Sequence, residues 1–115
     1  MKQAELGGLR SISFTVANQV HVITKAEYFA QINAEFEIKA AELNEDRTLM
    51  SPLPLGDQLT LYGLTMQAFY GDNDTERPTI FELEKWLLWN AWTDQKGMTQ
   101  YTAKVLFLKS VEGLW

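Results

Sequence analysis

The side chains that most often carry out chemistry are few in this sequence, and they do not form a catalytic set. There is no cysteine, which excludes a disulfide framework, a thiolate zinc site and a cysteine nucleophile. The only histidine, His21, has no metal-binding or nucleophilic partner near it along the chain, so we interpret it as an ordinary surface residue. The sequence also has no glycine-rich phosphate loop and no nucleophile elbow. It therefore predicts no enzyme activity, no catalytic residue and no cofactor.

Three acidic side chains, Asp72, Asp74 and Glu76, lie close together in the run GDNDTERP at positions 71–78. Carboxylates at this spacing are possible ligands for a hard cation. The run lacks the ligand pattern of an EF-hand loop and its glycine. We therefore assign these residues to turns and caps, and predict no metal site.

Length and composition indicate one folded, soluble domain that is monomeric. The chain has 115 residues, of which 46% are apolar and 22% charged, as is usual for a globular domain. Four Trp and six Phe are a heavy aromatic content, which fills a core and often lines ligand grooves. The net charge of −5 has the wrong sign for nucleic acid or an anionic membrane. A phosphate-bearing ligand would have to meet local positive charge.

Targeting signals are weak. No apolar run approaches the roughly 18 residues of a membrane span, and no secretory signal is recognisable. Residues 6–26 lack acids and contain Arg10, Ser11, Ser13 and Lys25, which leaves a mitochondrial presequence as an alternative. The predicted location is the cytoplasm.

The first part of the chain predicts an N-terminal extension, residues 1–24, before the helical domain at 25–115. Between about 11 and 23 the pattern alternates, which favours a small hairpin with a turn near Asn18; an extended leader is the alternative. Thr24 and Glu27 have the spacing of a capping box and predict a helix start. That helix carries one apolar stripe along about twenty residues: Tyr28, Ile32, Phe36, Ala40 and Leu43.

Three more helices are expected after a loop at 44–54. Helix two is predicted from Leu55 to Tyr70, with Gly71 as its stop, and it is apolar on nearly every side. Such a helix is buried on two faces, or buries one face and offers the other to a ligand. A second capping box at Thr79–Glu82 predicts a third helix, ending near Asp94 or Gln95. A fourth helix is predicted from a Thr99 cap to Val111. The fold class is therefore an all-α four-helix bundle.

A set of motifs occurs in one order and at one spacing along residues 34–112. They are Tyr62-Gly63, Gln67-Ala68, Gly71-Asp72, Thr75-Glu76-Arg77-Pro78, Trp89, Ala91-Trp92 and Lys96-Gly97. At these residues the chain resembles the acyl-CoA-binding protein family, small four-helix carriers of long-chain fatty acyl-CoA esters. The resemblance implies non-catalytic binding and transport of such an ester. It also implies a first helix beginning near Ala34, so the helix predicted from residue 25 is longer by two to three turns.

The resemblance also implies a shallow groove among the helices. Phe36, Leu59 and Tyr62 match positions that line this groove, and the Tyr62 hydroxyl suits a phosphate contact. Phe107 stands where the family has a tyrosine, and its ring face would suit stacking on adenine. The complete set of candidate ligand-binding residues is Phe36, Ala40, Leu59, Tyr62, Gly63, Thr65, Met66, Lys85, Leu88 and Phe107.

Two departures from the family pattern concern charge. Thr65-Met66 stands where the family has Tyr-Lys, and Leu88 replaces a lysine directly before Trp89. A charge-assisted hydrogen bond contributes about 1.5–3 kcal/mol, so two missing lysines would weaken binding by roughly 3–6 kcal/mol. Reduced affinity is therefore expected. Lys85 and Lys104 are candidates to replace the missing charges, and a solvated helix face is the alternative for both.

Two other interpretations of the groove stay open. With Met66 and Leu88 in place of lysines, the groove is suited to another lipid, such as a fatty acid, or to a protein helix. This would make the chain a divergent lipid- or protein-binding module that keeps the scaffold and has lost the phosphate clamp. In the other interpretation, residues 12–32 of the chain itself fill the groove as a plug.

Overall fold

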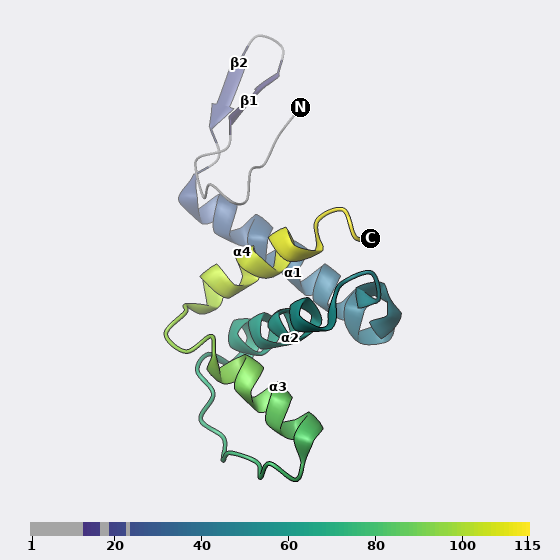
Figure 1. The fold of residues 1–115 in the computed structure, drawn as a ribbon. Helices are drawn as coiled ribbons and strands as arrows, with labels where there is room; N and C mark the ends of the chain where they lie inside the picture. Colours follow the sequence, from purple (N-terminus) through teal and green to yellow (C-terminus); the bar gives the residue numbers. More distant parts are fainter. Residues whose placement is uncertain (1–12, 17–18, 23) are drawn as a thin grey trace.

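The computed structural model describes residues 13–16, 19–22 and 24–115, with side chains from residue 24 onward. In this part of the chain, four α-helices follow a two-stranded hairpin (Figure 1). No helix among the described residues is long and apolar enough to cross a membrane. The elements are β1 (Ser13–Val16), β2 (Gln19–Val22), α1 (Lys25–Glu45), the 3-10 helix η2 (Arg47–Met50), α2 (Leu55–Tyr70), α3 (Leu83–Thr93) and α4 (Gln100–Val111).

The hairpin alternative for the N-terminal extension is confirmed. β1 and β2 pair antiparallel, with Ser13 opposite Val22 and Val16 opposite Gln19. The predicted turn residue, Asn18, lies outside the described residues. Figure 1 shows the hairpin beyond the N-terminal end of α1, away from α2 and α3. The division of the chain after residue 24 stays a prediction.

Helix α1 begins at the predicted capping box. The Thr24 hydroxyl accepts from the Glu27 amide at 3.1 Å, and the Glu27 carboxylate accepts from the Thr24 amide at 2.8 Å. The predicted stripe is buried, with Tyr28 and Ile32 extending the core toward the N-terminus of the helix. Because the capping box satisfies two backbone amides at the start of the helix, it fixes the residue at which the extra turns of α1 begin.

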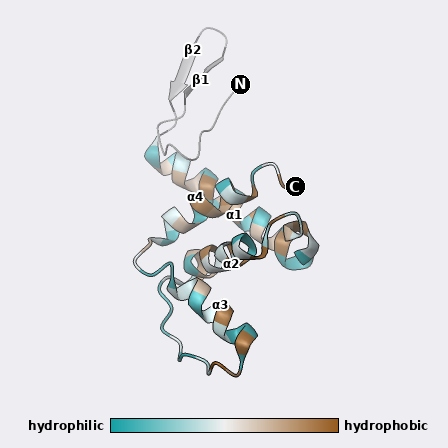
Figure 2. Ribbon diagram, in the orientation of Figure 1, coloured by the Kyte–Doolittle hydropathy of each residue, from teal (hydrophilic) through white to brown (hydrophobic). Residues whose placement is uncertain are grey.

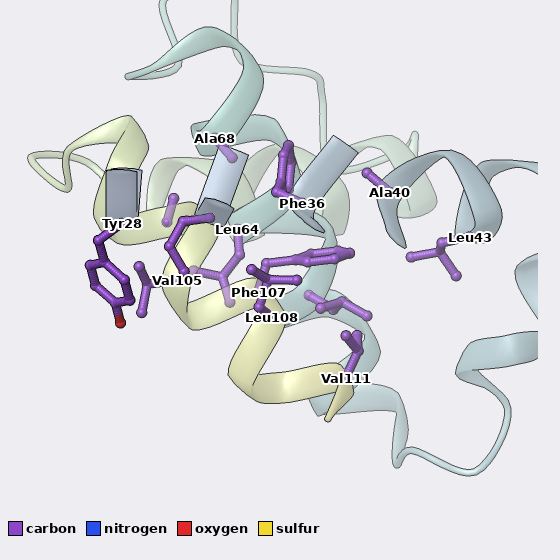
Figure 3. Packing of buried hydrophobic residues seen from close by; sticks show 13 residues of the cluster. Tyr28, Phe36, Ala40, Leu43, Leu64, Ala68, Val105, Phe107, Leu108 and Val111 are labelled. Atoms are coloured by element: carbon purple, nitrogen blue, oxygen red, sulfur yellow. The ribbon is translucent and has the colours of Figure 1, made fainter. Parts of the chain in front are cut away.

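Helices α1 and α4 run parallel. Phe29 lies against Tyr101, with ring centroids 4.3 Å apart, and Lys104 donates to the Asn33 side chain at 3.0 Å. Further along both segments, the Trp115 indole donates to the Glu42 carboxylate at 2.8 Å. Side chains of α1, α2 and α4 meet in one core (Figure 3). At its centre the rings of Phe36 and Phe107 meet edge to face, with centroids 5.1 Å apart.

The second predicted capping box is wrong. Helix α3 begins at Leu83, its cap residue is Glu82, and no side chain caps it. In a capping box the Glu82 amide would donate to the Thr79 hydroxyl. Here it donates to the Thr79 carbonyl at 3.0 Å. The four residues therefore form a turn in front of the helix. The Thr99 cap of α4 is confirmed, because its hydroxyl accepts from the Thr102 amide at 3.1 Å.

Helices α2 and α3 approach closely at Gly63. A Cβ atom built there would lie under 3.0 Å from the Ala91 carbonyl oxygen and carbon, and 3.3 Å from the Gln95 side chain. Helix backbone cannot move away as easily as the end of a flexible side chain. Gly63 is therefore required by packing, and this explains the glycine that sequence analysis placed among the ligand contacts.

We predict that Gly63→Ala destabilises the fold by about 1–3 kcal/mol, because overpacking at a backbone contact forces α2 and α3 apart. Gly56→Ala is the matched control on the same helix, since no atom lies within 4 Å of its added Cβ. The control should be neutral or more stable by up to about 1 kcal/mol, the helix-propensity difference. Urea unfolding followed by circular dichroism measures both. Equal effects of the two substitutions would contradict the packing role of Gly63.

Candidate functional site

Helix α2 has two apolar faces, and only one of them is buried. Leu61, Leu64 and Ala68 lie in the core. The other face carries residues at helical spacing that are half-buried or exposed, and at its two ends Leu55 is 68% and Phe69 is 49% exposed. We call this face the open stripe: Leu55, Leu59, Tyr62, Met66 and Phe69. An uncovered apolar stripe on a well-packed helix indicates a binding surface.

A hollow of about 240 Å³ lies beside the open stripe, where the first half of α2 faces α3. Leu59 and Leu87 contribute its large apolar side chains, and the other lining residues are mostly small or polar. The lining consists of Gly56, Leu59, Thr60, Leu87, Asn90, Ala91, Asp94 and Gln95. The volume is below the roughly 300–1,000 Å³ of pockets that enclose a whole drug-sized ligand. The hollow therefore fits part of an elongated ligand. It lies between α2 and α3, and of the residues predicted to line the groove among the helices it includes Leu59.

Tyr62 is the polar group of the open stripe, and its surroundings include a cation. Partial burial raises the pKa of Tyr62, while the nearby charge of Arg47 lowers it. The hydroxyl therefore stays protonated at neutral pH and is available as a donor. Arg47 belongs to η2, directly after the Asp46 cap of that helix.

Arg47 is not among the site residues predicted from sequence, because residues 44–54 are predicted to form a loop. One signal was present: Arg47 is the only Lys or Arg between Lys39 and Arg77. A guanidinium has a planar set of donors that matches phosphate oxygens. Arg47 is close enough to act electrostatically on the Tyr62 hydroxyl, and we call these two residues the Tyr62–Arg47 corner.

Several predicted site residues serve the scaffold. Phe36 and Phe107 have no exposed surface, and Ala40 is also buried. The prediction that the Phe107 ring stacks on adenine is wrong for this structure, because core side chains cover the ring (Figure 3). The Thr65 hydroxyl donates to the Leu61 carbonyl within α2 at 2.8 Å.

The residues at the missing lysine positions remain partly accessible. Met66 and Leu88 are both half-buried. Lys85 is exposed and precedes Leu88 by three residues on α3, so the two side chains differ in direction by about 60°. Lys104 is half-buried, with its ammonium 5.7 Å from the centre of the Phe36 ring. Whether either lysine serves a ligand stays a prediction.

The loop at 71–78 is held to α2, α3 and the segment before α4 by polar contacts. One oxygen of Asp72 accepts from the Gln67 side-chain amide at 2.8 Å and from the Gly97 amide at 2.9 Å. The Trp92 indole donates to the Gly71 carbonyl at 2.8 Å, and the Trp89 indole donates to the Thr75 carbonyl at 3.2 Å. In the described part of the chain, His, Asp and Glu side chains form no group of three that could hold a metal ion.

Comparison with known proteins agrees with this geometry. Residues 33–111 match the family model described as acyl CoA binding protein. The chain belongs to the acyl-CoA-binding protein family. It is 43% identical to acyl-CoA-binding protein 2 of Saccharomyces pastorianus over 79 residues, which cover 69% of this chain and 87% of that protein. It is 40% identical to the acyl-CoA-binding protein of Saccharomyces cerevisiae over the same shares of the two chains.

A solved member of the family has the same fold. The crystal structure of Oryza sativa acyl-CoA-binding protein 2 superposes with a TM-score of 0.66 at 33% identity, covering 74% of this chain and 89% of that one. The family match begins at residue 33, so the first turns of α1 and the hairpin precede it. Tyr28 and Ile32 in these turns join the core cluster with Val105. No residue that lines the hollow comes from the described part of residues 12–32, and the plug interpretation stays a prediction.

The contacts of Asp72 make stability depend on pH. The Gly97 amide, and then the Gln67 side-chain amide, lower the pKa of Asp72 from its usual value. Because the folded-state pKa is the lower one, this stabilisation is complete above the unfolded pKa, about 3.9, and disappears as pH falls through the folded pKa.

We therefore predict that the difference in unfolding free energy between the native chain and Asp72→Asn is largest near pH ~7 and shrinks as pH falls below about 4. Urea titrations at several pH values measure this difference. Asp74→Asn is the control for charge, because Asp74 lies two residues away in the same loop and is exposed. A difference that does not change with pH would show that the Asp72 carboxylate is not the group involved.

Proposed function

We propose that this chain binds long-chain fatty acyl-CoA esters and carries them without chemical change. The observation that carries the proposal is the open stripe of α2. This apolar surface lies beside the hollow and includes Tyr62 of the Tyr62–Arg47 corner. An acyl-CoA has the matching parts, a hydrocarbon chain and a phosphate-rich head. The printed names of the relatives describe acyl-CoA-binding proteins.

The hollow is the proposed site for part of the acyl chain. Leu59 and Leu87 provide apolar contacts across it. Burial of hydrocarbon contributes about 0.8 kcal/mol per methylene, so even a partly enclosed chain adds substantial affinity. The rest of a long chain would lie along exposed apolar residues next to the hollow, such as Leu55 on α2.

The head of the ligand is proposed to bind at the Tyr62–Arg47 corner. The Tyr62 hydroxyl donates to a phosphate oxygen, and Arg47 supplies positive charge that the net charge of −5 does not provide. Met66 and Leu88 offer no charge where the family resemblance implies lysines. Arg47 replaces at most one of two such contacts, so an affinity below that of related proteins is expected.

The apolar character of Met66 and Leu88 favours one alternative, a module for a free fatty acid or another lipid without a phosphate-rich head. In that case the corner would not distinguish a nucleotide head from a carboxylate. The absence of enzyme activity and the cytoplasmic location stay predictions of the sequence, with the mitochondrion as the alternative.

Isothermal titration of the ligand-free chain with palmitoyl-CoA, palmitate and coenzyme A tests the function. Palmitoyl-CoA should bind more tightly than either fragment, because it alone contacts both the hollow and the phosphate corner. The yeast relative of 40% identity, titrated in parallel, gives the reference affinity. Binding by this chain should be weaker by roughly ten- to ten-thousand-fold, a deficit of one or two charge-assisted contacts.

Equal affinity for palmitate and palmitoyl-CoA would support the lipid-module alternative instead. No binding of any of the three ligands would overturn both functions.

A second prediction concerns the phosphate corner. Arg47→Gln should weaken palmitoyl-CoA binding by about tenfold, the effect of one charge-assisted contact, and should leave palmitate binding unchanged. Lys25→Gln removes the same charge at the opposite end of α1, about 30 Å away along a helix of 21 residues. The control should bind palmitoyl-CoA like the native chain. Equal losses in both variants would mean that only overall charge matters.

A further inference from the structure

Three large apolar side chains are exposed at the start of α3 and in the turn just before it. Ile80 is 65%, Phe81 is 94% and Leu83 is 58% exposed. We call these three residues the apolar turn. Figure 2 shows hydrophobic colouring where the long loop ends and α3 begins, and Figure 1 places this end of α3 on the far side of α2 from α1 and α4.

The apolar turn is a formed structure. The Glu82 amide donates to the Thr79 carbonyl at 3.0 Å, which closes the turn, and Leu83 is the first residue of α3. The preceding loop is fixed to α3, since the Asn73 side chain donates to the Thr93 hydroxyl at 3.0 Å. Arg77 lies 6.0 Å from the centre of the Trp89 ring. These contacts present the three apolar side chains at one place on the surface.

We propose that the apolar turn docks on the surface of a zwitterionic phospholipid bilayer, with Phe81 entering the boundary between headgroups and acyl chains. This docking surface is separate from the proposed ligand site, and docking does not require a bound ligand. Aromatic and aliphatic side chains on a polar background are the groups that enter this boundary.

The size and shape of the patch favour a bilayer over a second protein chain. A large aromatic side chain has on the order of 200 Å² of surface, so the three exposed side chains together present roughly 400 Å². A stable protein dimer buries about 800 Å² on each partner. A side chain that is 94% exposed protrudes, and a protruding group needs a matching pocket on a protein. A fluid bilayer adapts to it.

Charge selects the kind of bilayer. Around the apolar turn, Glu76, Glu82 and Glu84 outnumber Arg77 and Lys85, which gives a local charge of −1 from three acids and two bases in residues 76–85. The whole chain carries −5. Anionic lipid would repel this surface, whereas a zwitterionic headgroup layer would not.

The position of Leu83 connects this surface to the hollow. Leu83 is one turn before Leu87 on α3, and residues four apart share a helix face. A bilayer at the apolar turn would therefore lie close to one side of the hollow. If the proposed function is correct, an acyl chain would have a short path between membrane and protein.

Flotation of the ligand-free chain with phosphatidylcholine vesicles tests the docking. Phe81→Glu should reduce the bound fraction by about tenfold or more, since it places a charge at the boundary. Ile38→Glu is the matched control, because Ile38 is 58% exposed on α1 and gains the same charge. Circular dichroism should show both variants folded. Added phosphatidylserine should weaken binding by the native chain.

Site-specific labelling gives a second measurement. Because the chain has no cysteine, Phe81→Cys and Ile38→Cys can each carry one environment-sensitive fluorophore. Vesicles should shift the emission of the label at position 81 to shorter wavelength and leave the label at 38 unchanged.

Three results would overturn the proposal. They are failure of the native chain to bind phosphatidylcholine vesicles, equal losses in Phe81→Glu and Ile38→Glu, and binding that requires anionic lipid. Sedimentation equilibrium supplies a fourth test. Self-association of the native chain that Phe81→Glu abolishes would assign the apolar turn to a second copy of the chain. Acyl-CoA titration of Phe81→Glu separates this proposal from the ligand-binding one, because loss of vesicle binding with unchanged acyl-CoA affinity would assign Phe81 to docking alone.

Discussion

The close approach of α2 to α3 at Gly63 is the contact on which the shape of the hollow depends. Because glycine has no Cβ, the Ala91 carbonyl can pack directly against α2. This contact holds α3 against α2 near the middle of both helices. On one side of the contact, Leu59 and Leu87 do not fill the space between the helices, and the hollow results. A larger residue at position 63 would change the separation that defines its width.

Just beyond this contact, Gln67 connects α2 to the rest of the chain. It is completely buried, and its amide group donates to Asp72 and, at 2.7 Å, to the Met98 carbonyl. A buried polar group without partners is costly, so these two bonds favour one arrangement of the loop at 71–78 and of the segment before α4. The polar contacts therefore fix the helices around the hollow without using any group of the open stripe.

The open stripe is possible because the other face of α2 is sufficient for the core. Leu61, Leu64 and Ala68 pack with Phe36 and Phe107, which are fully buried. Leaving a second apolar face uncovered forgoes part of the available hydrophobic stabilisation. Such a face persists in a folded protein when it serves binding. The buried phenylalanines thus support α2 from the core side, and the open stripe keeps its half-buried and exposed residues accessible.

Periodicity predicted much of this fold from sequence. The Thr24 box, the buried stripe of α1 and both ends of α2 are confirmed, because local hydrogen bonds and helix spacing determine them. The start of α3 could not be predicted, since Thr79–Glu82 fits either a capping box or a turn. The choice of the open face on α2 depends on where α4 and α3 pack. The same packing covers Phe107, and the electrostatic effect of Arg47 on Tyr62 likewise depends on how η2 lies relative to α2.

The charge content of the site has a consequence for selectivity. For a ligand head bound near Tyr62 as proposed, the half-buried, apolar Met66 lies one turn further along the same face of α2 and would reduce the water around it. With less water, the attraction between Arg47 and a phosphate is stronger, because the effective dielectric constant falls. Removing a multiply charged head from water is also more costly there. One cation does not balance several phosphates, so a head that leaves most of its charge in solvent is favoured over one that is fully enclosed.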